Sequence, residues 1–374
     1  MVRIGIDYTP AYEQGGGIGR LVRDLISYLA KADSKTNYRL FIAGTGDSPP
    51  ALAPNFTWRT TRLTPTWLAR IWHRAHLSVP IETFTGPLDL YHATDFVLPP
   101  VRRSTRTIVT VHDLSFVRVP ETATPSLKAY LDIVVPQSVR RADHVIADSA
   151  ATKRDLIDLY NLPSEKITVL LSGIDDRFAP FTGDPATVLR KYQIPQKPYI
   201  FSIGTVQPRK NYARIVKSLV QLRDSGLDID LVIAGGKGWL DGSLYQTIKD
   251  TGMSDHIHMI GFADEADIPV LYSTATCTAF PSLYEGFGFP VLESMACGTP
   301  VVTSNVSSLP EVAGDAALIV DPYDVDALAN ALRKLTTDEA MRDLLIQRGF
   351  QQAANFSWDD SARSLKEIYW RVLA

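Results

Sequence analysis

Short β-rich runs alternate with amphipathic helical segments along nearly the whole chain of 374 residues. Between the runs, apolar residues recur three and four positions apart, as in Leu21, Leu25 and Leu29, which is the spacing of one helix face. We expect strands at 2–6, 38–43, 107–112, 144–147, 167–171, 199–203, 230–234, 256–260, 275–280 and 300–303. This alternation predicts an α/β fold of doubly wound parallel sheets with helices on both faces.

A Gly- and Pro-rich stretch from 172 to 198 interrupts the alternation and is the expected linker. The length also favours two domains, at roughly 150 residues for each. We therefore expect one domain at 1–183 and a second at 184–356, facing each other across a cleft. A cut at 183 leaves 21 basic and 18 acidic residues before it and 17 and 23 after it, so the two halves are expected to meet different partners.

Composition excludes several classes of protein. Hydrophobic residues at 45% and charged residues at 21% are typical of a globular protein and not of a disordered one. The net charge of −3 gives no case for nucleic-acid binding. Cys277 and Cys297 are too few for a disulfide framework or a zinc site, and we expect buried thiols in a reducing compartment. No run of about 18 apolar residues occurs, so we expect a cytoplasmic protein without a membrane span.

In the first half, two motifs lie where ligands collect in open parallel sheets, after the carboxyl ends of strands. Gly16 and Gly17 lie in a glycine cluster before a helix, where backbone N–H groups can approach an anion; the alternative is a flexible turn. His112 ends a strand and can hydrogen-bond a sugar hydroxyl or position a leaving group. Its alternative is a histidine paired in the core.

In the second half, Arg209 and Lys210 follow an apolar strand and the turn at Gly204-Thr205. Two adjacent cations at a strand end can neutralise a diphosphate without a metal, Arg209 through its planar fork and Lys210 as a point charge. The alternative is a solvated surface pair.

The most specific segment is 282–300. Glu285 follows a strand, and Pro290 fits the first turn of the next helix. The backbone of Gly286, Phe287 and Gly288, with the helix N-terminus, is therefore suited to bind a phosphate. Glu293, within the first turns, can then contact another part of an elongated ligand; alternatively it only complements the helix dipole.

On these residues the chain resembles the retaining glycosyltransferases of family 4. Glu285 and Glu293, with seven residues between them, match the E-x7-E motif of that family. The resemblance spans nearly the whole chain and has further matches at 15–20, 112–113, 173–175, 208–211, 261–262 and 307–312.

The resemblance implies a GT-B fold, with two Rossmann-like domains and a final helix within 357–374 that packs back on the first domain. The first domain would bind the acceptor and the second a nucleoside diphosphate sugar. The implied donor contacts are Glu285 with the transferred sugar, Gly286, Phe287 and Gly288 with the phosphates and sugar, Glu293 with the ribose, Arg209 and Lys210 with the diphosphate, and His112, Gly16 and Gly17 from across the cleft. Thr205 stands where many relatives carry Arg, so Arg209 would contribute more of the diphosphate binding.

The expected reaction is retaining transfer of a hexose, mannose or glucose in type, to a saccharide or lipid-linked saccharide in polysaccharide synthesis. Fixed cations and N–H groups would stabilise the departing diphosphate, so no metal and no cofactor beyond the co-substrate is expected. Two Asp-x-Asp pairs at 228–230 and 324–326 are interpreted as structural. GDP-mannose is the commonest expectation among similar chains, but the sequence leaves the base, sugar, acceptor and oligomeric state open.

Residues 48–81 contain no acidic residue but include Trp58, Trp67 and Trp72 and the arginines Arg59, Arg62, Arg70 and Arg74. We expect either peripheral contact with an anionic membrane, on its inner face, or a basic surface over the acceptor site. Two other functions stay open: a nucleotide-sugar epimerase of the same architecture and a non-catalytic nucleotide-sugar-binding scaffold.

Overall fold

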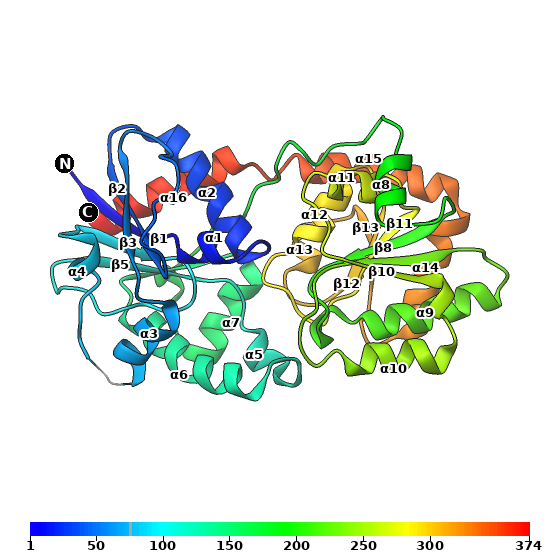
Figure 1. Ribbon diagram of the computed structural model, residues 1–374, viewed down its shortest axis with the longest axis horizontal. Helices are drawn as coiled ribbons and strands as arrows, with labels where there is room; N and C mark the ends of the chain where they lie inside the picture. The colour runs from blue at the N-terminus through cyan, green and yellow to red at the C-terminus, as the bar shows by residue number, and fades with distance from the viewer. Residues whose placement is uncertain (75–76) are drawn as a thin grey trace. The chain divides into compact units, whose positions relative to one another are not determined.

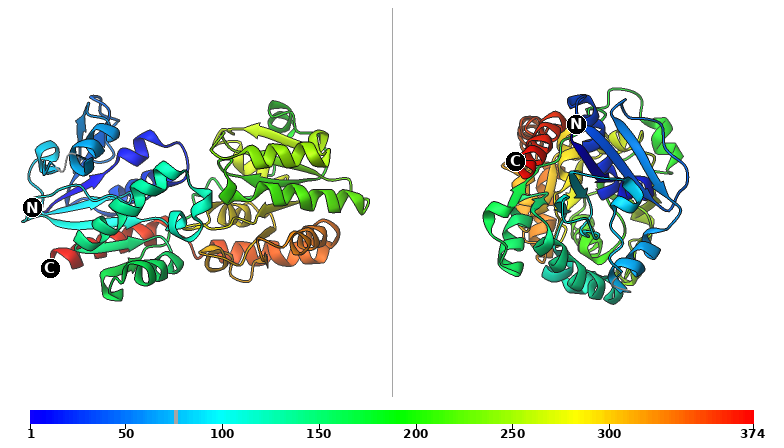
Figure 2. Two further views of the ribbon diagram at one scale, coloured as in Figure 1. Left: turned by 90° about the horizontal axis from the view of Figure 1, so that it is seen from below. Right: turned by 90° about the vertical axis from the view of Figure 1, so that its left-hand side faces the viewer.

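The computed structural model describes residues 1–74 and 77–374, except the side chains of residues 73 and 74. It divides the chain into two compact units (Figure 1). Unit 1 comprises Met1–Leu114, Ser126–Gly173 and Ser357–Ala374, and unit 2 comprises Ser115–Pro125 and Ile174–Phe356. Each unit is built on its own parallel sheet, with helices on both faces (Figures 1 and 2). The expected fold class of two doubly wound α/β domains is confirmed.

Unit 1 contains a seven-stranded sheet in the order β3-β2-β1-β4-β5-β6-β7. All of its paired strands are parallel. The chain order reverses beside β1, so the carboxyl ends of β1 and β4 flank the switch point at which ligands collect in such sheets. The strands are β1 (Arg3–Asp7), β2 (Asn37–Ala43), β3 (Phe56–Thr61), β4 (Leu90–Ala93), β5 (Arg106–Val111), β6 (His144–Ala147) and β7 (Ile167–Val169).

The helices of unit 1 include the last one of the chain, α16 (Trp358–Leu373), which packs on α2 (Ile18–Ala32). The buried hydroxyl of Tyr369 on α16 lies 2.8 Å from Nδ1 of His92 on β4, so the end of the chain is tied to the middle of this sheet. The other helices are α1 (Thr9–Glu13), α3 (Pro65–Ala69), the π-helical turn Arg70–Arg74, α4 (Glu82–Thr85), α6 (Pro125–Arg141) and α7 (Ala150–Tyr160).

Unit 2 contains a six-stranded parallel sheet in the order β10-β9-β8-β11-β12-β13. Its strands are β8 (Tyr199–Ile203), β9 (Asp230–Ala234), β10 (Ile257–Gly261), β11 (Cys277–Phe280), β12 (Val301–Ser304) and β13 (Ala317–Val320). Its helices are α5 (Ser115–Arg118), α8 (Ala186–Lys191), α9 (Tyr212–Asp224), α10 (Gly242–Thr251), α11 (Ile268–Ser273), α12 (Phe289–Ala296), α13 (Leu309–Ala313), α14 (Val325–Thr337) and α15 (Glu339–Ala353).

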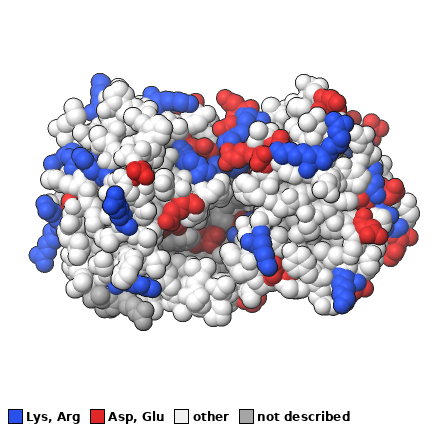
Figure 3. Space-filling model, viewed as in Figure 1, with Lys and Arg blue, Asp and Glu red and all other residues white. Residues whose placement is uncertain are grey.

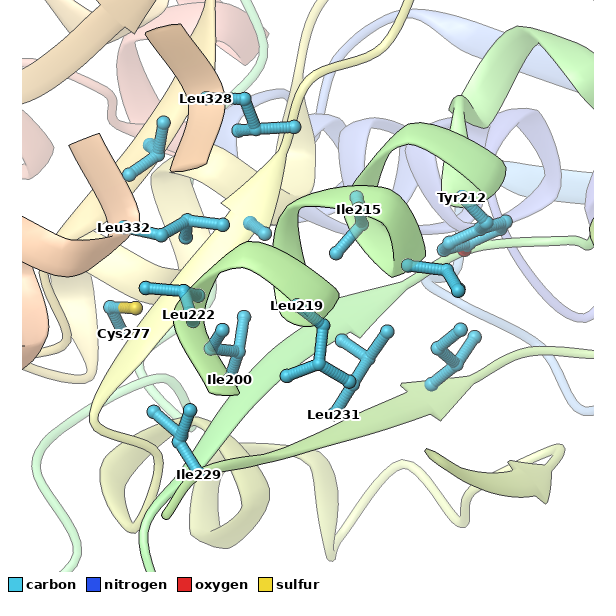
Figure 4. Packing of buried hydrophobic residues seen from close by; sticks show 14 of the residues in the cluster. Ile200, Tyr212, Ile215, Leu219, Leu222, Ile229, Leu231, Cys277, Leu328 and Leu332 are labelled. Carbon is cyan, nitrogen blue, oxygen red and sulfur yellow. The ribbon is translucent and has the colours of Figure 1, made fainter. Parts of the chain in front are cut away.

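The strands of unit 2 bury both of their faces because successive side chains point to opposite sides of a sheet. Ile200 on β8 packs under α9 and α14, in the cluster shown in Figure 4. Its neighbours Tyr199 and Phe201 belong to a different cluster, with Leu189 of α8 and Leu271 of α11. Because helices cover both faces of the sheet, the functional loops leave from its edge.

The observed elements differ from the expected ones in three strands and one boundary. Strands β3, β4 and β13 were not expected; β3 and β13 lie at the edges of their sheets, and β3 is largely polar. The domain boundary expected at 183 lies inside unit 2, which begins at Ile174. The amide of Ile174 donates to the carbonyl of Phe356, and Phe178 is buried in the core of unit 2. Contacts with that core, and not the Gly and Pro content, therefore decide the boundary.

Candidate functional site

Glu285 lies in the turn between β11 and α12, at the carboxyl edge of the sheet of unit 2. Its amide donates to the hydroxyl of Ser307 at 2.9 Å, and its carbonyl accepts from the hydroxyl of Ser308 at 2.9 Å. Gly288, which precedes α12, has a φ of 128°, a conformation that favours glycine. The turn is therefore held by hydrogen bonds from the segment before α13 and has little freedom to move.

Arg209 and Lys210 lie in the 3-10 turn Pro208–Lys210, after the neighbouring strand β8. Nη1 of Arg209 is 2.7 Å from Oε2 of Glu285, and Nζ of Lys210 is 2.7 Å from Oε1. The backbones also join, because the amide of Leu283 donates to the carbonyl of Arg209 at 2.8 Å. The two cations and the carboxylate thus form one group, which we call the Glu285 triad.

The electrostatics of the Glu285 triad favour the ionised carboxylate. Burial alone would raise the pKa of Glu285, but the positive charges of Arg209 and Lys210 lower it to about 2. Two cations with one carboxylate leave a formal charge of +1 at the carboxyl ends of β8 and β11. Such a group can bind an anion through charge-assisted hydrogen bonds.

Packing confines the side chain of Lys210. A Cβ at Gly204, where φ is 145°, would come 3.0 Å from Cε of Lys210. The hydroxyl of Tyr212 donates to the carbonyl of Gly204 at 2.8 Å, and the Lys210 ammonium lies 4.7 Å from the centre of the Phe280 ring. The next residue in that turn, Thr205, is exposed. The φ of Gly204 therefore favours glycine, and a side chain at this position would crowd Lys210.

Glu293 and Phe287 have core environments. Glu293 on α12 is 2% exposed, and its Oε2 accepts from the hydroxyl of Tyr272 at 3.0 Å. The Phe287 ring packs edge-on against Phe289 and Phe356. Gly286, between Glu285 and Phe287, is also buried. The ring of Phe287 thus contributes to packing, and a ligand can use this segment through its backbone.

In unit 1, His112 follows β5 and is 4% exposed. Its Nδ1 lies 2.8 Å from Oδ2 of Asp148 and its Nε2 lies 2.8 Å from the carbonyl oxygen of Thr94. Burial alone would lower the pKa of His112, but Asp148 and Asp95 raise it to about 9. His112 therefore lies at a strand end and is also paired in the core. The sequence analysis did not predict its partner, Asp148. A signal for it existed, because Asp148 directly follows β6, the neighbour of β5.

Gly16 and Gly17 form the open end of the loop between α1 and α2. Gly17 has a φ of 50°, and no atom lies within 4 Å of a Cβ placed at either glycine. Arg23 supports the loop by donating to the carbonyls of Ala11 and Gln14 at 2.7 Å. These glycines and His112 belong to unit 1, whereas the Glu285 triad belongs to unit 2. A joint site across a cleft stays a prediction.

The acid-free stretch 48–81 holds β3, α3 and the turn Arg70–Arg74. Trp67 is 54% exposed, with the Arg70 guanidinium 5.0 Å from its ring centre. Trp58 instead packs on Tyr8, and Trp72 donates to the carbonyl of Val79. The side chain of Arg74 and residues 75–76 lie outside the described residues.

The surface carries both signs of charge, and basic and acidic side chains are interspersed on the face seen in Figure 3. Within the described part of the chain, no helix has both the length and the apolar character needed to cross a bilayer.

Comparison with known proteins gives matches in both units. The family model "Glycosyltransferase Family 4" matches residues 15–178, and "Glycosyl transferases group 1" matches residues 187–352. The chain is 35% identical to O-antigen chain mannosyltransferase B of Escherichia coli, over 75% of this chain and 74% of that protein. It is 32% identical to a D-inositol 3-phosphate glycosyltransferase of Salinispora arenicola, over 64% and 57%. Sucrose-phosphate synthase from Thermosynechococcus elongatus superposes with a TM-score of 0.78 at 20% identity, over 100% of this chain and 99% of that one.

Proposed function

We propose that this chain, which belongs to the glycosyltransferases of group 1 and family 4, transfers a hexose of mannose or glucose type from a nucleoside diphosphate sugar. The acceptor is a saccharide or lipid-linked saccharide in polysaccharide or glycoconjugate synthesis. The GT-B fold and the family expected from the sequence are confirmed. The observation that carries the specific reaction is the Glu285 triad. GDP-mannose is our first choice of donor, because the name of the Escherichia coli relative specifies a mannosyltransferase.

The triad supplies what departure of a diphosphate requires. Cleavage of the anomeric C–O bond develops positive charge on the sugar and negative charge on the leaving phosphate. Arg209 and Lys210, each 2.7 Å from Glu285 in the free protein, are held in place to stabilise that negative charge. The N–H groups at the start of α12 add to the same field.

We further propose front-side displacement with retention at the anomeric carbon. The bond from that carbon to the β-phosphate oxygen breaks on the same face on which the bond to the acceptor oxygen forms. The leaving phosphate oxygen takes the acceptor proton, so no protein base is needed. In this scheme the Glu285 carboxylate, ionised because of its pKa of about 2, accepts hydrogen bonds from hydroxyls of the hexose.

Metal independence is part of the proposal, because Arg209 and Lys210 provide the positive charge that a divalent ion would otherwise supply. Turnover should be unchanged in EDTA. Loss of activity in EDTA, restored by a divalent ion, would contradict this part.

The proposal is tested by incubating the protein with GDP-mannose, UDP-glucose and other GDP- and UDP-sugars, with and without saccharide acceptors. We expect acceptor-dependent sugar transfer, strongly reduced in Lys210→Ala and unchanged in Lys217→Ala, which alters an exposed lysine on α9. Conversion of the donor sugar without acceptor would instead indicate the epimerase. Donor binding without turnover on any acceptor would indicate the scaffold.

A membrane-facing role for residues 48–81 is a further part of the proposal, which places the protein at the cytoplasmic face of an anionic membrane. Trp67 is exposed beside Arg70, with Arg62 and Leu77 also exposed in this stretch. Aromatic and basic side chains together favour binding to an anionic bilayer. Cosedimentation with anionic vesicles should fall in Trp67→Ala and Arg70→Glu but not in Trp370→Ala, which removes an exposed tryptophan on α16. Absence of binding at low salt would contradict the membrane contact.

A further inference from the structure

The surroundings of His112 determine which of its ring nitrogens carry protons. Nε2 lies 2.8 Å from the carbonyl oxygen of Thr94, and a backbone carbonyl can only accept a hydrogen bond. Nε2 must therefore carry a proton and donate it. This nitrogen has no lone pair to offer to a substrate.

Nδ1 of His112 faces the carboxylate of Asp148 at 2.8 Å. Both groups are buried, with His112 4% and Asp148 5% exposed. Burial raises the pKa of the Asp148 carboxyl, and the positive charge of His112 opposes that rise. A charged pair in such a place is stabilised by its own hydrogen bond, and carboxylates near the ring further favour the imidazolium.

Those further charges come from every strand end near the ring. Asp95, after β4, has an oxygen 4.0 Å from Nε2 of His112. Asp113 adds negative charge next to Asp95 and Asp148, while Asp7 and Tyr130 interact with Asp95. His92 on β4 also interacts with His112. Both ring nitrogens of His112 therefore point toward surroundings in which negative groups dominate.

We propose that Asp148 is a positioning residue that holds His112 as an imidazolium with both N–H groups donating inside unit 1. In the transfer reaction, His112 then keeps both of its protons and serves neither as a general acid nor as a general base. This inference rests on the proposed function for its catalytic part. The two donated hydrogen bonds fix the orientation of the ring at the carboxyl end of β5.

His92 provides an internal reference in the same unit. Its Nδ1 lies 2.8 Å from the hydroxyl of Tyr369 and its Nε2 lies 2.8 Å from the hydroxyl of Thr110. Hydroxyls can donate as well as accept, so a neutral ring satisfies both contacts. Burial lowers the pKa of His92 to about 3. Unit 1 therefore holds both a neutral buried histidine, His92, and a charged one, His112, and these two differ in the carboxylate of Asp148.

The first test is nitrogen NMR of the histidine-labelled full chain without substrates, with the His112 signals assigned from a His112→Gln variant. In the unsubstituted protein at pH 7.5 we expect both His112 nitrogens to be protonated and His92 to be neutral. A His112 ring that carries one proton at pH 7.5 would overturn the inference. This measurement requires no variant at Asp148.

The second test follows turnover against pH in Asp148→Asn, with Asp158→Asn on α7 as a matched exposed control. Without the carboxylate, we expect the His112 pKa to fall toward its ordinary 6.5. About a tenth of the rings would then stay charged at pH 7.5, so we expect kcat to fall by about tenfold and to recover at acid pH. The unsubstituted protein should keep its activity up to a pH near 9. A variant with the activity and pH profile of the unsubstituted protein would overturn the catalytic part.

The two tests separate this inference from the proposed function. If no hexosyl transfer occurs with any donor, the proposed function fails while the NMR result still decides the state of His112. If transfer occurs and the His112 ring is neutral, this inference alone fails.

Discussion

The two units use opposite charge arrangements at the carboxyl edges of their sheets. In unit 2 a carboxylate, Glu285, lies between two cations, Arg209 and Lys210. In unit 1 a histidine, His112, lies against Asp148, with Asp95 4.0 Å away. The comparison shows that the carboxyl edge of a parallel sheet can present either sign of charge, because the neighbouring strand supplies the counter-charge.

The two arrangements also differ in what they leave for a ligand. The cations of unit 2 share one carboxylate and keep a net positive charge, which the proposed function assigns to the diphosphate. The ring nitrogens of His112 bind a carboxylate and a backbone carbonyl that are part of the fold. We therefore expect substitutions in unit 2 to affect donor binding and chemistry, and substitutions in unit 1 to affect the pH range of activity.

The largest effect is expected for Glu285→Gln, which leaves Arg209 and Lys210 without their counter-charge and removes the expected ligand of the hexose. Turnover should fall by about 100- to 1,000-fold, measured as acceptor-dependent sugar transfer at saturating donor. Glu339→Gln, an exposed carboxylate on α15, should have no effect. Equal rates in both variants would break the comparison, because unit 2 would then have no special carboxylate.

A smaller effect is expected on the pH dependence of stability, with opposite signs in the two units. The Glu285 pKa is lowered from 4.5 to about 2, so its contribution is complete above pH 4.5 and is lost as the pH falls toward 2. The His112 pKa is raised from 6.5 to about 9, so its contribution is complete below pH 6.5 and is lost as the pH rises toward 9. Each contribution is about 3 kcal/mol.

Urea unfolding at several pH values measures these contributions. The stability gap between the unsubstituted protein and Glu285→Gln should close on the acid side, and the gap to Asp148→Asn should close on the alkaline side. If the stability gap closed on the same side of the pH range for both variants, the opposite charge assignments of Glu285 and His112 would be contradicted.

Lys210→Ala should lower the free energy of unfolding at pH 7 by about 2 kcal/mol. The buried Glu285 carboxylate keeps Arg209 as a partner, so the loss is smaller than for an unpaired buried charge. Denaturant titration against the exposed-lysine control Lys217→Ala gives the difference. A loss no larger than that of the control would mean that Arg209 alone satisfies Glu285.

The smallest effect is expected for Tyr369→Phe, which removes the hydroxyl partner of His92. Because His92 is neutral, the cost of about 1 kcal/mol should be the same at pH 6 and pH 8.5. A cost that changes between these pH values would mean that His92 is charged, which would remove the contrast with His112.

The sequence predicted that Glu285, Arg209 and Lys210 lie close together in one pocket, but not that both cations pair directly with the carboxylate. The E-x7-E motif and the cation pair each follow a recognisable strand. Their 2.7 Å contacts depend on β8 and β11 being neighbours, which is a property of the fold. For the same reason Asp148 was missed: its link to His112 depends on the pairing of β5 with β6.

Other differences also depend on contacts outside the local sequence. Phe287 lies inside a motif that points to ligand binding, yet its ring packs against Phe356 from the end of unit 2, a contact 69 positions away that no local pattern reveals. Strand β3 escaped prediction because its sequence, FTWRTT, mixes polar and aromatic residues at a sheet edge. Long-range packing decides both cases.

The central claim, that the Glu285 triad is a diphosphate site, is tested most directly by calorimetric titration of GDP and UDP into the unsubstituted protein, Lys210→Ala and Lys217→Ala. We predict that the better of the two nucleotides binds Lys210→Ala about 10- to 100-fold more weakly than the unsubstituted protein, and that Lys217→Ala binds it normally. Equal dissociation constants for all three proteins, or no binding of either nucleotide, would contradict the claim.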